Sequence, residues 1–222
     1  MPARNRTTAL ERAIAGNGAS RPTPIDALGL ARRRWVAGER LDMGRLAQDL
    51  GISRATLYSW VGSKERLIGE VIWSYADDGM RQAREAAIGT GADYIVDVFE
   101  RFARLNAAFE PLRRFIEQDA ELALRVLTSK DSPVQGRMIA VARDLLVTQV
   151  EAGALAPALD IETLAYTMVR VAEAFLYSDI IAGSEPDVDK AVAVVQVLLH
   201  APPVLPPPAS RKRTKRRGQS GP

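Results

Sequence analysis

The chain has 222 residues, of which 47% are hydrophobic, and a formal net charge of +3 at pH 7. This length accommodates one sizeable core and a smaller second domain. The chain contains no cysteine and a single histidine, His200. These counts exclude disulfides, thiolate metal sites and histidine-cluster metal sites, so we expect no metal and no cofactor.

The positive charge is concentrated at the two ends of the chain. Residues 1–66 contain 12 Lys and Arg and 6 Asp and Glu, whereas residues 67–208 contain 12 and 21, and residues 209–222 add six basic residues. This asymmetry favours a basic end that faces a polyanion. A plainer alternative is that helix surfaces are simply charged. No apolar run reaches the roughly 18 residues of a membrane span, and residues 1–24 have arginines but no apolar stretch like that of a secretory signal, so we expect a cytoplasmic protein without a membrane partner.

Apolar residues recur three or four positions apart almost throughout, which predicts an all-α fold. We expect residues 1–22 to be a flexible extension. Thr23 and Pro24 then begin a helix that Gly38 ends. The chain continues with helices over 43–50, from Ser53 to about Trp60, and over 64–87.

Long amphipathic helices are predicted after the first 90 residues, over 92–109, 111–129, 133–152, 161–182 and 187–200. Glycine and proline mark the breaks between them. Residues 201–222 are rich in proline and basic residues and cannot bury enough apolar area to order themselves, which predicts a disordered tail.

The run LAQDLGISRATLYSWVGSKERL, residues 46–67, has the spacing of a helix-turn-helix. The small side chain of Ala47 allows two helices to cross closely, Gly51 makes the turn, and Leu57 packs into the angle. The second helix has few apolar residues, so only one of its sides is expected to be buried. The alternative is one tight corner in an all-helical protein.

The exposed side of this second helix offers groups that can read DNA. Four residues are candidates for base edges in the major groove: Arg54, Ala55, Ser59 and Trp60. Thr56, Tyr58 and Lys64 are suited to phosphate oxygens, which fix the register of the protein on the duplex.

The same run resembles the DNA-binding signature of TetR-family transcriptional regulators. The matching positions are Leu46, Ala47, Gly51, Ser53, Thr56, Leu57, Tyr58, Lys64 and Leu67. The resemblance implies a three-helix helix-turn-helix domain over 23–66, with Arg45 and Ser53 also near the DNA, and a helical-bundle domain for ligand binding and dimerisation over 67–200. It further implies a homodimeric repressor that binds a palindromic operator and is released by a small apolar effector.

Two positions depart from the family pattern. Asp42 stands where Thr or Ser is usual; it can cap the second helix, but its charge opposes a phosphate contact. Val61 replaces the usual Phe beneath the recognition helix. The run SWVGSKERLIGEV also resembles a QsdR-like subgroup linked to lactone catabolism, which makes a lactone one candidate effector.

The larger domain has two predicted surfaces. Aromatic and apolar residues with a few polar neighbours are candidates for the effector cavity, although such residues usually form core: Phe99, Phe102, Asn106, Met138, Tyr166, Arg170 and Phe175. Arg170 would be buried unless it pairs, for which Glu173 at i+3 is available. Helices 161–182 and 187–200 are apolar on more than one face, which predicts that they form the homodimer interface.

Two other classes of function are possible alternatives. A nonspecific architectural DNA-binding protein would use the basic ends but would not need the large domain after residue 67. An enzyme would need a catalytic arrangement, and the adjacent Asp77 and Asp78 point about 100° apart on a helix. We therefore predict no catalytic residues.

Overall fold

The computed structural model describes residues 21–130 and 132–202, and every regular element within them is a helix. The predicted all-α fold is confirmed. The two terminal predictions, the flexible extension 1–22 and the disordered tail 201–222, lie almost wholly outside the described residues. The helices are α2 (Pro24–Val36), α3 (Met43–Asp49), α4 (Arg54–Val61), α5 (Lys64–Ala86), α6 (Gly91–Ala107), α7 (Glu110–Gln118), α8 (Ala120–Thr128), α9 (Pro133–Glu151), α10 (Ile161–Leu176), α11 (Ser178–Ala182) and α12 (Val188–His200).

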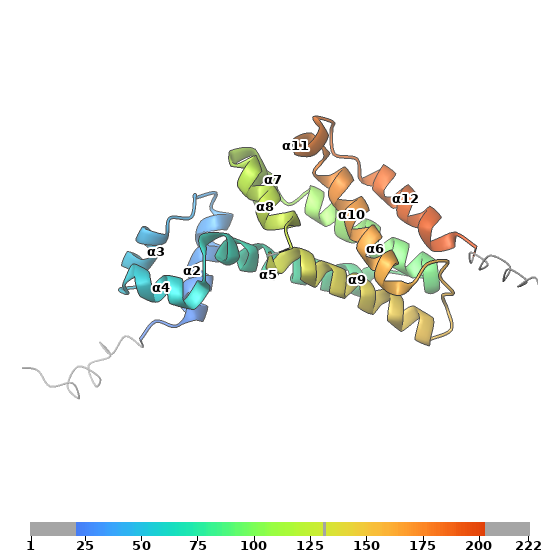
Figure 1. Ribbon diagram of the computed structural model, residues 1–222, viewed down its shortest axis with the longest axis horizontal. Coiled ribbons are helices and arrows are strands. Elements are labelled where there is room, and N and C mark those ends of the chain that lie inside the picture. The colour runs from blue at the N-terminus through green and yellow to red at the C-terminus, as the bar shows by residue number, and fades with distance from the viewer. Residues whose placement is uncertain (1–20, 131, 203–222) are drawn as a thin grey trace, which may run out of the picture.

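The helices form two regions joined by α5 (Figure 1). We call α2, α3 and α4 the head, and α6 to α12 the body. The head lies at one end of the elongated molecule, and α5 runs from it into the body (Figure 1). Within the part of the chain that the structure describes, no helix is both long enough and apolar enough to cross a membrane.

Side-chain caps begin each helix of the head, and a further cap begins α5. Thr23 and Asp26 form a reciprocal capping box at α2, in which the Thr23 amide donates to Asp26 Oδ2 at 2.8 Å. Ser53 Oγ accepts from the Thr56 amide at 3.0 Å at the start of α4. Ser63 Oγ accepts from the Arg66 amide at 3.1 Å at the start of α5. Each cap satisfies a helix-end amide that would otherwise need water, so the polar residues fix where the helices begin.

The turn between α3 and α4 depends on Gly51, whose φ of +66° favours glycine. The Gly51 amide donates to the Gln48 carbonyl and the Ile52 amide to the Ala47 carbonyl, both at 3.0 Å. This pair of bonds is a Schellman ending for α3. Leu57 is fully buried, so α4 is held by one face, as the sequence predicts.

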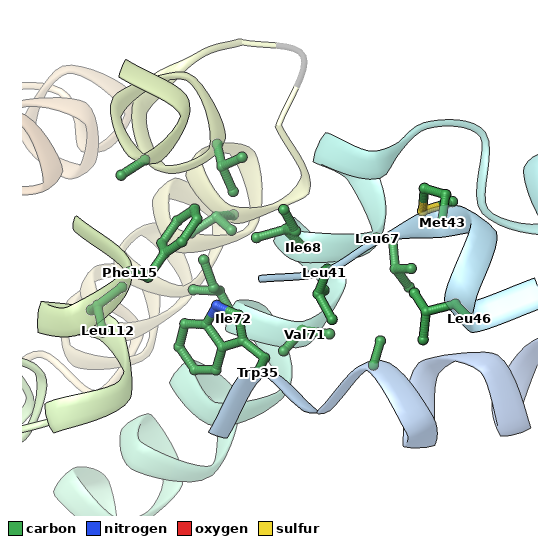
Figure 2. Packing of buried hydrophobic residues seen from close by; sticks show 14 of the residues in the cluster. Trp35, Leu41, Met43, Leu46, Leu67, Ile68, Val71, Ile72, Leu112 and Phe115 are labelled. Carbon is green, nitrogen blue, oxygen red and sulfur yellow. The ribbon is translucent and has the colours of Figure 1, made fainter. Parts of the chain in front are cut away.

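The apolar core of the head continues into α7 and α8. Figure 2 shows Trp35 of α2, Ile68 and Ile72 of α5, and Leu112 and Phe115 of α7 in one cluster. The Trp35 ring lies 6.1 Å from that of Phe115, an edge-to-face distance at which aromatic pairs attract. The head is therefore packed on the body as well as tethered to it by α5.

One polar contact reinforces this junction. Arg40, in the loop between α2 and α3, donates through Nη2 to the carbonyl of Gln118 at the end of α7, at 2.9 Å. Gln118 Nε2 in turn donates to the Gly38 carbonyl at 3.4 Å. The loop of the head and the end of α7 therefore each donate a side-chain hydrogen bond to a carbonyl of the other.

Two predicted helices are each divided in the structure. The prediction of one helix over 111–129 is wrong, because Asp119 leaves helical geometry and its Oδ1 accepts from the Leu122 amide at 3.1 Å, which starts α8. The prediction of one helix over 161–182 is also wrong, because the chain breaks at Tyr177. The buried Ser178 hydroxyl then lies within 3.1 Å of the carbonyls of Phe175, Ser184 and Glu185, where it can donate to one of them.

A second core holds the body together. It lies between α6, α9, α10 and α12, and the side chains of Ile95, Leu146, Leu164 and Val195 have no exposed surface. Each comes from a different helix, so this core depends on contacts between segments far apart in sequence.

Candidate nucleic-acid interface and effector cavity

The outward face of α4 carries four of the nine residues predicted to contact DNA. Arg54, Ala55, Tyr58 and Ser59 are exposed, while the opposite side chain, Leu57, is buried. Trp60 is half-buried and packs against the head core, so less of its ring is free than the prediction assumed. The result is a short helix with a polar and basic outer face, which can enter a major groove.

The hydroxyl groups of Ser53 and Thr56, at the start of α4, are hydrogen-bonded to each other. Ser53 Oγ and Thr56 Oγ1 lie 2.9 Å apart, and either can donate to the other. Both lie where the exposed amides of the first turn of α4 attract an anion. A hydroxyl pair at a helix N-terminus is a suitable contact for a phosphate oxygen.

Asp42 caps α3, as its sequence position predicts. Its Oδ1 accepts from the Arg45 amide at 2.8 Å, and this bond lowers the pKa of the Asp42 carboxyl, with a smaller contribution from nearby Arg54. Arg45 is exposed on α3 beside this cap. The proximity of two arginines reduces the repulsion that the Asp42 charge would exert on a phosphate.

Lys64 is the first residue of α5 and is half-buried. It lines a cleft between the head and α7, together with Trp35, Arg114 and Asp119. It is therefore close to the junction between head and body as well as to the end of α4.

The three consecutive arginines of α2 are not all available to a polyanion. Arg34 forms an ion pair with Asp49 of α3, and the Arg32 guanidinium lies 4.7 Å from the centroid of the Tyr75 ring. Arg33 is exposed. Two of the three arginines of this helix therefore serve its packing on α3 and on α5.

The structure brings four of the predicted effector residues together inside the body. Phe99, Phe102 and Met138 line a cavity of about 50 Å³ whose lining is wholly apolar, and we call it the apolar chamber. Phe102, Asn106 and Met138 line a neighbouring cavity of about 60 Å³, which we call the polar chamber.

The other three predicted effector residues, all on α10, line neither chamber. Tyr166 is half exposed, and the Arg170 guanidinium lies 5.2 Å from the centroid of its ring. Arg170 Nη1 also donates to Glu173 Oε2 at 2.5 Å, which is the i+3 pair that the sequence indicates. Phe175 is half-buried near the break before α11.

The polar chamber contains three polar residues that were not among the predicted effector contacts: Gln135, Glu173 and Tyr177. Gln135 and Glu173 are 5% and 9% exposed, and Gln135 Nε2 donates to Glu173 Oε1 at 3.4 Å. Burial raises the pKa of Glu173, against the opposing effect of Arg170, and burial also raises the pKa of the Tyr177 phenol. Glu173 could be found from its spacing to Arg170, but nothing in the sequence pattern singles out Gln135.

Exposed apolar side chains lie on both α10 and α12, which pack side by side in the body, and we call this set the apolar strip. Tyr166, Val194 and Val197 are 50%, 37% and 70% exposed. Surfaces of this kind commonly mark a protein interface.

Comparison with known proteins gives the context for these surfaces. The family described as "Tetracyclin repressor-like, C-terminal domain" matches residues 90–200. The chain is similar to the solved structure of the R. erythropolis transcriptional repressor QsdR from the TetR family, with 29% identity and a TM-score of 0.75 over 80% of this chain and 96% of that chain. The TetR-family regulator PfmR from Thermus thermophilus matches at 24% identity over 78% of this chain and 96% of that chain, with a TM-score of 0.39. No curated protein matches the chain.

Proposed function

Because the chain belongs to the TetR family of transcriptional regulators, we propose that it is a repressor that binds a palindromic operator as a homodimer and leaves it when a small apolar effector binds. The observation that carries this proposal is the outer face of α4, where Arg54, Ala55, Tyr58 and Ser59 are exposed around a buried Leu57. The similar QsdR is itself a repressor, which favours repression over activation.

The proposed DNA contacts divide by chemistry. Arg54, Ala55, Ser59 and Trp60 read base edges, as the outward direction of α4 allows. Phosphate oxygens are held by Arg45, Ser53, Thr56, Tyr58 and Lys64. This division supports a sequence-specific regulator over an architectural protein, because a nonspecific binder needs only the second group.

The proposed dimer uses the exposed strip of α10 and α12, with Tyr166, Val194 and Val197 at its centre. Pairing the two helices with their copies would bury the strip in a four-helix interface. The copies of α4 then lie on opposite sides of a two-fold axis. They match half-sites separated by about 34–36 Å or a multiple of that spacing.

The proposed effector cavity is the pair of chambers in the body. The polar chamber is lined by residues of α5, including Ile72 and Ala76, and also by Leu112 of α7. Ile72 and Leu112 also belong to the core that the body shares with the head. An occupant that displaces these side chains would alter the packing of the head, and a lactone is the first class of compound to try.

The experiment that tests the proposal is selection of bound fragments from random-sequence duplex DNA by the full-length protein. We expect a recovered consensus with two-fold symmetry, and fluorescence anisotropy should show that affinity for it falls steeply with salt. Equal binding to the consensus and to a shuffled duplex would favour an architectural role. Lactones are then added to the complex, and release of DNA would support the effector step.

A further inference from the structure

The two chambers of the body are neighbours separated by a shared wall. They share the wall residues Phe102, Met138, Val169 and Ala172. At about 50 and 60 Å³, each is far smaller than the roughly 300–1,000 Å³ of most ligand pockets. Met138 stands at the shared wall, and methionine side chains adapt readily to an occupant. Movement of Met138 and Phe102 would join the chambers.

The polar chamber also adjoins the outside. It shares Asn106, Leu112, Leu176 and Tyr177 with an outer cleft of about 330 Å³ between α7 and the end of α10. The polar chamber therefore lies between the outer cleft and the apolar chamber. A ligand that fills all three has a polar group at the middle, in the polar chamber, and an apolar end in the apolar chamber.

Glu173 sets the chemistry of that middle position. Its two carboxylate oxygens accept one hydrogen bond each, from Arg170 and from Gln135, which leaves lone pairs for a further donor. Arg170 pairs with this carboxylate but does not line the chamber. A ligand anion would therefore face the Glu173 oxygens, whereas a ligand cation would add an uncompensated charge to a pair that is already neutral.

We infer that the body binds an uncharged amphiphile whose hydrogen-bond donor meets the Glu173 carboxylate and whose apolar tail lies in the apolar chamber. This inference rests on the proposed effector role of the cavity and narrows the class of ligand: a lactone meets it only if the molecule also carries an N–H or O–H donor. It assigns Glu173 as the residue that selects the ligand and Gln135 as its support. The inference also predicts that neutral molecules bind more tightly than carboxylate anions of the same chain length.

The test uses three probes with one tail: octanamide, methyl octanoate and sodium octanoate. Binding to the full-length protein is measured by calorimetry without DNA, so the result does not depend on operator recognition. We expect octanamide to bind most tightly and methyl octanoate, which lacks a donor, about tenfold more weakly. Octanoate is expected to be weaker still. Equal affinity for octanamide and octanoate, or no binding of any probe, would overturn the inference.

The variant Glu173→Gln keeps the shape of the side chain and removes its charge. It should bring the affinities for octanamide and octanoate to within about threefold of each other, whereas Glu151→Gln, an exposed carboxylate of α9, should leave the wild-type order unchanged. An unchanged order in Glu173→Gln overturns the assignment. If that variant does not fold, the order of the three probes on the wild-type chain decides. DNA release is measured separately: binding in the expected order without release would refute the repressor proposal and leave the ligand class standing.

Discussion

The head and the body differ in how far local signals specify their structure. In the head, three short helices are fixed by local signals: caps at Thr23, Asp42 and Ser53, and the left-handed turn at Gly51. In the body, side-chain caps also begin α8, α9, α10 and α12. The arrangement of α6, α9, α10 and α12 nevertheless depends on buried side chains from distant segments. The body also retains chambers and an exposed apolar strip. Local signals suit the head, because its recognition helix must be held in a fixed position. Packing between distant segments suits the body, because its cavity must change shape.

The largest expected effect concerns the apolar strip, for which we have proposed a copy of the chain as partner. Val197→Asp in α12 should weaken the dimer by about 3–6 kcal/mol, because burial of one such side chain contributes roughly 1.5–3 kcal/mol and symmetry counts it twice. Analytical ultracentrifugation measures the change. Ile25→Asp, on the 74% exposed Ile25 of the head, is the matched control and should not alter the oligomeric state. A variant at Val197 that sediments like the wild type would remove the strip from the interface.

The next effect compares one glycine from each region. Gly91, at the start of α6, has φ of +59°, and a Cβ there would meet the Ala154 carbonyl. Gly91→Ala should lower the free energy of unfolding by about 2–5 kcal/mol, from overpacking and from the left-handed backbone. Gly51→Ala meets nothing within 4 Å and should cost only about 1 kcal/mol. Urea denaturation measures both, and a larger loss at Gly51 would reverse the contrast.

The third effect separates the two kinds of DNA contact proposed for the head. Arg54→Ala should lose about 1–3 kcal/mol at particular base pairs of the selected operator and little on other DNA. Lys64→Ala should weaken binding to every duplex and reduce the slope of the salt dependence by about one. Anisotropy on the operator and on a shuffled duplex distinguishes them. A salt slope unchanged by Lys64→Ala would indicate that this residue serves the cleft beside Asp119 instead.

The smallest effect is the response of the head to acid. The Arg45 amide lowers the pKa of Asp42 below its ordinary value of 3.8, so this cap stabilises the folded head above that pH. Its contribution is lost as pH falls through the lowered pKa. Asp42→Ser keeps a capping oxygen without the charge, and its stability should fall less than that of the wild type as the pH is lowered below about 4. Circular dichroism melts at each pH measure this, and parallel curves would contradict it.

The sequence allowed the head to be predicted more fully than the body because the signals of the head are local. The spacing from Ala47 to Leu57 predicted the corner, and Thr23, Asp42 and Ser53 predicted the helix starts. In the body, Asp119 looked like an ordinary surface residue of a long helix, although it caps α8. The contact between Gln135 and Glu173 joins residues 38 positions apart, so no periodic pattern could reveal it. Cavities depend on such long-range placement, and for that reason only part of the proposed effector site could be anticipated.

The shared aromatic cluster at Trp35 bears on how this protein can be engineered. A chimaera that exchanges only residues 23–66 with another regulator would expose Phe115 and leave Trp35 without its ring neighbours Tyr75 and Phe109. An exchange that also carries residues 67–75 and 109–128 would keep the cluster whole. Recombinant sensors built from this scaffold should therefore be joined at three points along the chain, after residues 75, 108 and 128.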